Sequence, residues 1–412
     1  DGPFTVTEDA GEGELSVISG NVLDNDLHAN GEPGADDRSF AGWTTPPSIL
    51  TQYGTLVLGA DGSYSFELDD SRPATQGLSS QDVISETFHY DITDSDGDTD
   101  TASLTIRIQG TNDIVVINDL DGNEVAVSDA NLPDGSAENA GLLTVDKSFT
   151  FSAPDGVKSL MVGDVELIHD GVVTTLPASV TSGLGNSLVI TGVVFDPATG
   201  AGTVTYSYTL LDNEFHDKLT HDTSLGESFD VVLVDDDGSS LTKSLDVTVA
   251  DDTVNAVDDG PFTVTEDAGV GQLSEVHGSV LNNDLHANGE PGADGRSFTG
   301  WTTTPSILTQ YGTLVLGSDG SYSFELDNSR PATQGLSSLD VISETFSYGI
   351  TDSDGDTDTA TLTIRIQGTN DVVVIDGLDG NEVAVSDANL PGGSAEDASL
   401  LTVANSFTFS AP

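Results

Sequence analysis

Residues 91–113 read DITDSDGDTDTASLTIRIQGTND, and this stretch determines the predicted fold. Its segment SLTIRI places Leu104, Ile106 and Ile108 on one face of an extended chain, the pattern of a strand with one buried side. The turn TDSDGDTD at 93–100 precedes that strand and carries four carboxylates in seven positions. The acidic segment GTND follows the strand. A strand, an acidic turn, a second strand and an acidic linker therefore succeed one another.

The same kind of pattern fills the rest of the chain. TYSYTLL (205–211) again alternates apolar and polar side chains, and Asp-Gly turns such as the one in ADGSYSF (60–66) interrupt the strings at short intervals. Turns of this kind connect neighbouring strands in hairpins. Helical spacing with capping residues does not extend over any long segment. The sequence therefore predicts an all-β protein built from antiparallel β-sandwiches.

Two levels of repetition organise the chain. Residues 1–154 recur as residues 259–412, with 130 of 154 positions identical. A fainter repeat lies within this period, because FHYDITDSDG (88–97) aligns with FDVVLVDDDG (229–238) and an acidic linker, VADD, follows the second copy. Repetition at a fixed period is the signature of a tandem array, so we expect the sandwiches to form an elongated array.

We expect domain boundaries near Asp113, Asp258 and Asp371. The predicted units are 1–113, 114–258, a second copy of the first unit at 259–371, and the N-terminal part of a second copy of the 114–258 unit at 372–412. Isolated strands are not stable in water. Residues 114–154 and 372–412 are therefore each expected to dock on the domain that precedes them.

The composition excludes several classes of function. The chain has 412 residues and a formal charge of -60, which excludes nucleic acid as a partner because a phosphate backbone needs a basic face. It contains no Cys, so neither disulfides nor thiolate metal sites stabilise it. No run of 18 apolar residues predicts a membrane span. The sequence begins in mid-pattern, and we expect it to be a piece of a longer chain.

Several segments resemble a known group of proteins. VLDNDL (22–27), DGSYSFEL (61–68) and residues 91–113 look like the VCBS and cadherin-like repeats of giant bacterial RTX adhesins. FTFSAPDGVKSLMVG (149–163) and VVLVDDDGSS (231–240) look like the type I secretion target repeats of the same proteins. The resemblance implies Ig-like or cadherin-like sandwiches in series, calcium at the linkers, secretion to the cell surface, and a stalk function. The glycine-rich GGxGxD repeat of that group is absent.

The acidic turns suit calcium. Calcium accepts six to eight oxygen ligands at about 2.3–2.6 Å with irregular geometry, whereas magnesium requires a tighter octahedron. The EF-hand does not fit, because Gly97 is fourth from Asp94 and the twelfth residue of the loop is Thr105. The alternative is that these Asp residues form turns and a solvated face. Three acidic turns, each followed by an acidic linker, favour calcium.

A calcium ion at a domain junction needs ligands from both neighbours, and the resemblance to cadherins implies an early Glu, a strand-end turn and an Asn/Asp linker. The first joint is predicted to use Glu8, Asp94, Asp96, Asp98, Asn112 and Asp113, with Asp119 and Asp121 across the joint. The second is predicted to use Asp235, Asp237, Asp251 and Asp252, with Asp258 and Asp259 from the next unit. The copy of the first joint is predicted to use Glu266, Asp352, Asp354, Asp356, Asn370, Asp371 and Asp379, and there Gly377 replaces Asp119 while Asp376 replaces Asn118.

Other chemistry has little support in the sequence. His216 and His221 in HDKLTHD could share a metal, but a spacing of five residues matches neither HExxH nor one face of a strand, so a solvated loop is favoured. No GxSxG elbow and no Cys nucleophile occur. Trp43 and Trp301 occupy equivalent positions and could stack on a sugar, but a place in the sandwich core or as a loop anchor is favoured. We therefore do not expect an enzyme.

The sequence favours a calcium-rigidified extender of a large secreted bacterial adhesin, which holds a terminal binding module away from the cell. Its partners are calcium and the neighbouring repeats, and we expect a monomer. Extracellular calcium modules have dissociation constants of about 10⁻⁴–10⁻³ M, so the sites would fill only outside the cell. The alternative is a carbohydrate- or protein-binding adhesive module in its own right.

Overall fold

The computed structural model describes residues 1–28, 30–44, 48–220, 223–302, 306–378, 380 and 383–410. Nearly all of its regular structure is β-strand, and its two α-helices, α1 (Pro73–Gln76) and α2 (Pro331–Gln334), are single turns. The all-β prediction is confirmed. The chain divides into unit 1, residues 1–132, 139–216 and 221–251, and unit 2, residues 133–138, 217–220 and 252–412. Among the described residues, no helix has the length and apolar character needed to cross a bilayer.

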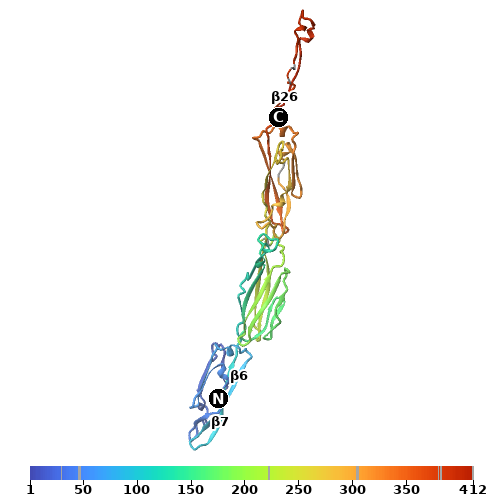
Figure 1. Ribbon diagram of the computed structural model, residues 1–412. Helices are drawn as coiled ribbons and strands as arrows, with labels where there is room; N and C mark the ends of the chain where they lie inside the picture. The colour runs from blue at the N-terminus through green and yellow to red at the C-terminus, as the bar shows by residue number, and fades with distance from the viewer. Residues whose placement is uncertain are drawn as a thin grey trace. The chain divides into compact units, whose positions relative to one another are not determined.

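The first sandwich of unit 1 contains the strands labelled β6 and β7 in Figure 1. One sheet has the order β1-β7-β6-β3 and the other has the order β2-β5-β4. The strands are β1 (Phe4–Thr7), β2 (Val17–Asn21), β3 (Ser39–Trp43), β4 (Gly54–Leu58), β5 (Ser63–Leu68), β6 (Val83–Thr93) and β7 (Thr99–Gln109), with short 3-10 helices η1 (Val22–Asp24) and η2 (Ile49–Gln52).

The second sandwich of unit 1 is larger. Its sheets have the orders β14-β15-β16-β10-β8 and β13-β12-β11-β17-β18-β9. The strands are β8 (Val116–Asn118), β9 (Val125–Ser128), β10 (Thr144–Ser152), β11 (Val157–Val162), β12 (Val165–His169), β13 (Val172–Val173), β14 (Ala178–Val180), β15 (Ser187–Asp196), β16 (Ala201–Thr209), β17 (Ser224–Asp235) and β18 (Ser240–Ala250), with 3-10 helices η3 (Asp129–Asn131) and η4 (Ala140–Leu142).

Unit 2 contains a third sandwich, which repeats the first. Its sheets have the orders β19-β25-β24-β21 and β20-β23-β22. The strands are β19 (Asp259–Thr265), β20 (Glu275–Ser279), β21 (Ser297–Trp301), β22 (Gly312–Leu316), β23 (Ser321–Leu326), β24 (Val341–Thr351) and β25 (Thr357–Gln367), with 3-10 helices η5 (Val280–Asn282) and η6 (Leu308–Gln310).

The strand alternation read from the sequence produces the cores. Leu104, Ile106 and Ile108 on β7 are fully buried, and they pack in the first core with Phe66 and Phe88. Their counterparts build the third core. Burial of such side chains contributes about 1.5–3 kcal/mol each, so the hydrophobic faces of the paired sheets account for the sandwich architecture.

In each sandwich the first strand of one sheet pairs with the last strand in parallel. Thr7 on β1 lies opposite Gln109 on β7, Ser128 on β9 lies opposite Ala250 on β18, and Thr265 on β19 lies opposite Gln367 on β25. The remaining pairs are antiparallel, as predicted. This parallel pairing matters for function, because it brings the residue after the first strand to the same end of the sandwich as the linker that follows the last strand.

The prediction that residues 114–154 dock on the preceding domain is wrong, because their strands do not pair with strands of the first sandwich. β8 and β10 join the sheet of β16, and β9 pairs with β18, so these residues complete the second sandwich. The boundary predicted near Asp258 also needs correction. Val254 packs in the core of the third sandwich, and unit 2 takes up the chain from residue 252.

The C-terminal segment has a structure of its own. β26 (Val374–Asp376), labelled in Figure 1, pairs with β27 (Thr408–Ser410) in a two-stranded sheet, and two 3-10 helices lie between them, η7 (Asp387–Asn389) and η8 (Ala398–Leu400). Neither strand joins a sheet of the third sandwich. Within the described residues, the strand pairing expected between this segment and residues 259–371 is therefore not seen.

Candidate metal centre

The acidic residues predicted for the first joint lie at two opposite ends of the first sandwich. Glu8 follows β1 and reaches the Gln109 end of β7, where its backbone N–H donates to the Gln109 carbonyl at 3.0 Å. The turn containing Asp94 connects β6 to β7 at the other end, beside Thr99. The 11 residues of β7 separate the two groups. The prediction that Glu8 and Asp94 share one ion is therefore wrong.

A cluster of carboxylates gathers at the Glu8 end, which we call the first joint. The backbone N–H of Thr111 donates to Glu8 Oε2 at 3.1 Å, and the backbone N–H of Asp113 donates to Asp155 Oδ2 at 2.6 Å. Asp155 stands just before β11 of the second sandwich. The first joint thus combines the end of β1, the linker after β7 and the loop after β10.

The hairpin between β17 and β18 adds Asp235 and Asp237 to the first joint, so their predicted assignment to the second joint is wrong. Asp235 accepts from the backbone N–H of Ser239 at 2.7 Å and so closes its own turn. Asp237 accepts from the backbone N–H of Ser80 at 2.8 Å, and Ser239 Oγ donates to Asn112 Oδ1 at 2.8 Å. These contacts lie within unit 1. They connect the acidic turn of the second sandwich to the first sandwich and its linker.

Each of these carboxylates has one oxygen that is buried and unsatisfied. Their residues are no more than partly exposed, and Glu8 is fully buried. Within the described part of the chain, the oxygens without a hydrogen-bond partner are Glu8 Oε1, Asp113 Oδ2, Asp155 Oδ1, Asp235 Oδ2 and Asp237 Oδ1. A buried polar atom left without a partner costs about 1–3 kcal/mol, and more when charged, so this concentration needs a physical explanation.

The electrostatics of the first joint favour the binding of a cation. Burial, with added repulsion from Asp113 and Asp155, raises the pKa of Glu8 to about 8. Burial also raises the pKa of Asp155 to about 6, with repulsion from Asp113, Asp237 and Asp235 acting in the same direction. The pKa of Asp113 is raised by burial and by neighbouring carboxylates. A cation among them would lower all three values.

The donor set fits calcium. All five unsatisfied atoms are carboxylate oxygens, and calcium prefers hard oxygen ligands in irregular arrangements, mono- or bidentate. A backbone N–H donates to the other oxygen of four of the five carboxylates, namely Glu8, Asp155, Asp235 and Asp237. The side chains are therefore oriented without consuming the free oxygens.

Two residues predicted to act across the first joint lie elsewhere. Asp119 and Asp121 follow β8, and β8 leads away from the joint because Val116 pairs with Ser152 and Asn118 with Thr150. Asp119 accepts from Thr150 Oγ1 at 3.2 Å. Asp121 lines a shallow surface depression with Asp246 on β18. Their assignment to the joint is therefore wrong, and Asp155 occupies the place predicted for them.

The copy of the first joint in unit 2 is less complete. Glu266 is fully buried, its Oε2 accepts from the backbone N–H of Thr369 at 3.0 Å, and its Oε1 has no partner within the described residues. Burial raises its pKa, and Asp371 adds to the effect. Asn370 is exposed and Asp371 is partly exposed. Asp379, predicted as a ligand here, lies outside the described residues.

Three acids predicted for the second joint accept hydrogen bonds within unit 2. Asp258 Oδ1 accepts from the backbone N–H and the hydroxyl of Thr361, both at 2.8 Å. Asp259 accepts from Tyr348 Oη at 3.0 Å, and burial raises its pKa to about 7. Asp252 accepts from the backbone N–H groups of Ser136 and Ala293, both at 2.9 Å. Hydrogen bonds within unit 2 thus satisfy the carboxylates predicted as joint ligands.

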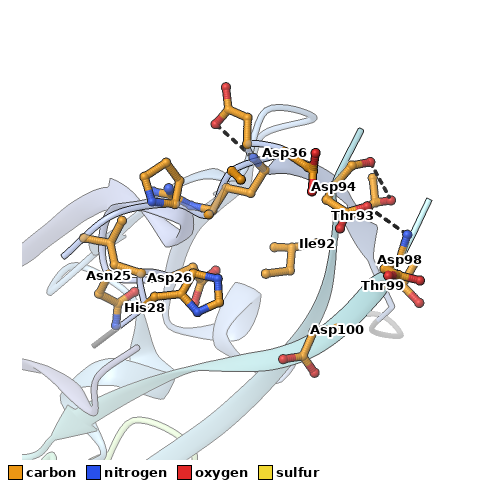
Figure 2. Close-up of a pocket in the computed structure, with 16 residues that line it drawn as sticks. Asn25, Asp26, His28, Asp36, Ile92, Thr93, Asp94, Asp98, Thr99 and Asp100 are labelled. Atoms are coloured by element: carbon orange, nitrogen blue, oxygen red, sulfur yellow. Dashed lines mark hydrogen bonds between the residues drawn. The ribbon is translucent and has the colours of Figure 1, made fainter. Parts of the chain in front are cut away.

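The turn TDSDGDTD partly follows the alternative interpretation, in which Asp residues form turns. Asp94 Oδ1 accepts from the backbone N–H groups of Gly97 at 2.9 Å and Asp98 at 2.8 Å. In addition, Asp36, Asp94 and Asp96 can each place an oxygen within 4.8 Å of the other two. Figure 2 shows Asp94, Asp98 and Asp36 around a depression of about 480 Å³ at this end of the first sandwich. Asp36 was not among the predicted ligands.

In unit 2 the corresponding turn is more buried. Asp352 Oδ1 accepts from the backbone N–H of Gly355 at 3.0 Å and of Asp356 at 2.7 Å, and Oδ2 has no partner within the described residues. Asp354 is buried as well. Asp356 accepts from Lys218 Nζ at 3.0 Å. This ion pair engages Asp356 with a side chain rather than leaving it free for an ion.

The structure also shows where the histidine and tryptophan singled out in the sequence lie. His216, expected in a solvated loop, is buried and its Nε2 lies 3.0 Å from Asp129 Oδ2, whereas His221 lies outside the described residues. Trp43 packs against Phe40 and Tyr90 with ring centroids 5.2 and 5.6 Å away, and its Nε1 donates to the Gly59 carbonyl. Trp43 is partly buried and packs against the first core, as expected.

Comparison with known families bears on the repeats directly. Residues 1–107 match the family described as Bacterial Ig domain, and residues 250–368 match the family described as Bacterial cadherin-like domain. The chain carries bacterial Ig-like and cadherin-like domains in tandem. Because the two matched segments are copies of one repeat, the two descriptions apply to the same type of sandwich. Neither description is that of an enzyme family.

One curated relative and several solved structures show further similarity. The chain is 35% identical over 115 residues to "Calcium-binding lectin RapA2" of Rhizobium johnstonii, which covers 26% of this chain and 48% of that protein. The chain thus matches about half the length of that relative. Mouse clustered PcdhgC3 EC1-3 aligns at 11% identity with a TM-score of 0.28, covering 85% of this chain and 94% of that one. The protocadherin gammaB7 EC3-6 cis-dimer aligns at 10% with a TM-score of 0.30, covering 94% and 75%. Scores this low establish no common arrangement of domains.

Proposed function

We propose that the first joint binds calcium and that the chain is a calcium-rigidified extender from a large secreted bacterial surface adhesin. The observation that carries this proposal is the set of five unsatisfied carboxylate oxygens, contributed by the first sandwich, its linker and the second sandwich. An ion held by all three would connect the two sandwiches. The ligands are Glu8, Asp113, Asp155, Asp235 and Asp237.

The chain's own residues prepare this site. The backbone N–H groups of Thr111, Asp113 and Ser80 each hold one oxygen of a carboxylate and leave the second oxygen available. Without a cation, the buried charges repel one another across the joint. When bound, calcium supplies the positive charge that offsets this repulsion and a set of coordination bonds shared by both sandwiches.

Several features of the chain support an extracellular location. The net charge of -60 and the absence of Cys suit a protein that folds outside the cell when calcium becomes available. The relative named as a calcium-binding lectin supports calcium as the cofactor. The resemblance to the repeats of RTX adhesins supports export by a type I system and a role as a stalk between the cell and a terminal binding module.

Isothermal titration calorimetry of the complete 412-residue chain with calcium tests the proposal. The wild-type chain should bind calcium with dissociation constants in the range of about 10⁻⁴–10⁻³ M. A double variant, Asp113→Asn with Asp235→Asn, should lose the first-joint component while other components persist. Identical isotherms for the two proteins would overturn the assignment of calcium to this joint.

A second candidate function is a ligand-binding adhesive module. The specific observation in its favour is the depression beside Asp36 and Asp94 (Figure 2), taken together with a relative named as a lectin. Surface-immobilised glycans, probed with the chain in calcium and in chelator, distinguish the two functions. Calcium-dependent retention that Asp36→Asn abolishes would favour the adhesive module over a pure extender.

A further inference from the structure

The second sandwich has a counterpart of the first joint at its other end. Asp129 follows β9, just as Glu8 follows β1, and both strands run parallel to the last strand of their sheet. Ser128 pairs with Ala250, so Asp129 lies level with Asp251. The equivalent position in the first sandwich carries a buried carboxylate oxygen without a partner, at Glu8. The sandwich therefore presents an acidic residue at the same structural position at this end.

The composition of this second cluster differs from that of the first joint, because it includes an imidazole. His216 Nε2 lies 3.0 Å from Asp129 Oδ2, and both side chains are completely buried. Asp129, His216 and Asp251 each place one potential ligand atom within 4.8 Å of the other two. The backbone N–H of Glu214 donates to Asp129 Oδ2 at 3.2 Å and helps to fix that carboxylate. Asp251 is partly exposed, which leaves a route for an ion.

We propose that Asp129, His216 and Asp251 form a binding site for a divalent first-row transition metal, with Zn²⁺ as the best fit. Imidazole suits zinc, copper, iron and nickel, whereas calcium selects oxygen ligands. Two ligand atoms at about 2.1 Å from a tetrahedral zinc are about 3.4 Å apart, so the 3.0 Å between Nε2 and Oδ2 has to widen by about 0.4 Å when a metal replaces the shared proton. Three protein ligands leave a position for water.

This site does not depend on calcium at the first joint, because it shares none of the five ligands proposed there. The competing interpretation is a structural hydrogen bond between a buried imidazole and a carboxylate. The two interpretations differ in what His216 does when zinc is added. If His216 is a ligand, its substitution abolishes zinc binding. If His216 is only structural, its substitution changes the stability of the fold and leaves the zinc isotherm unchanged.

The test is a calorimetric titration of the complete chain with Zn²⁺ in buffer that already contains excess calcium. One equivalent of zinc should bind to the wild-type chain, and His216→Gln should weaken binding at least tenfold. The matched control is His169→Gln, because His169 is an exposed imidazole with Glu166 3.0 Å and Asp170 3.4 Å away and is itself a candidate for adventitious zinc. This control should retain the tight site.

Further measurements keep the proposal open to refutation. If His216→Gln fails to fold by circular dichroism, Asp251→Asn replaces it, since that side chain is partly exposed. X-ray absorption at the zinc edge should show one imidazole with oxygen ligands. Absence of zinc binding, loss of binding only in His169→Gln, or displacement of zinc by calcium would each overturn the proposal. A normal calcium isotherm in His216→Gln would show that the first joint is independent of it.

Discussion

Replacement of Glu8 by Gln should uncouple the stability of unit 1 from calcium. Glu8 is fully buried and its Oε1 has no partner within the described residues. With a dissociation constant of about 10⁻⁴–10⁻³ M, 10 mM calcium stabilises the native state by RT ln(1 + [L]/Kd), about 1.4–2.7 kcal/mol. Loss of one charged ligand is expected to weaken binding at least tenfold, which reduces that gain to about 0.4–1.4 kcal/mol.

Melting temperatures in 10 mM calcium and in chelator measure this difference. At roughly 4 °C per kcal/mol, calcium should raise the midpoint of the transition by about 6–11 °C in the wild type and by about 2–6 °C in Glu8→Gln. Glu12→Gln is the matched control, because it removes the same charge from an exposed side chain nearby. Glu266→Gln should have a smaller effect, since the described chain supplies its site with fewer carboxylates. Equal calcium shifts in Glu8→Gln and Glu12→Gln would refute the reasoning.

Three other outcomes are expected. In chelator, the free energy of unfolding should fall as pH rises from about 4.5 to about 8. The pKa of Glu8 is raised to about 8 in the folded chain, so the folded state binds protons more readily than the unfolded state. Calcium should abolish this pH dependence, and a pH dependence that persists with calcium in denaturant titrations would contradict the prediction. Phe149→Ala should cost about 3–5 kcal/mol of stability. Phe407→Ala, at the equivalent but exposed position, should change stability by less than about 0.5 kcal/mol. Similar losses for the two variants in chemical denaturation would contradict the assignment of β10 to the second core. Asp155→Asn should weaken calcium binding by calorimetry, and Asp119→Asn should not; the reverse order would restore the original ligand set.

The strands of this protein were readable from the sequence because each alternates apolar and polar side chains over a core. Leu104, Ile106 and Ile108 are all fully buried, as their spacing predicts. Asp113 lies in the first joint, as its place in the linker after β7 predicts. Asp235 was predicted for the second joint, but it lies beside Asp113 in the first.

The composition of the joint was harder to predict, since it depends on which ends of the strands coincide. The parallel pairing of β1 with β7 places Glu8 beside the linker and far from Asp94, and alternation alone carries no information about strand direction. Asp155 and Asp129 were missed for the same reason. A usable signal exists in hindsight, because FTVTE and VAVSD both end a short strand with an acid, at Glu8 and Asp129.

Membership of residues 114–154 in the second sandwich depended on pairings distant in sequence. Phe149 lies opposite Val204, and Val125 lies opposite Val247. Neither the repeat boundaries nor the local apolar pattern identifies those partners. The near-identity of the two copies adds nothing on this point, because residues 372–410 have the same strand-forming pattern, yet most of the described side chains in that range are exposed.

The most direct test of the central claim measures whether calcium fixes the first sandwich relative to the second. The chain contains no Cys, so cysteines introduced at the exposed positions Val57 and Val194 would be the only sites for spin labels. Double electron–electron resonance should give a broad distance distribution in chelator and a narrow one in 10 mM calcium, and Glu8→Gln should keep it broad in both. Distributions of equal width with and without calcium in the wild-type background would contradict the account.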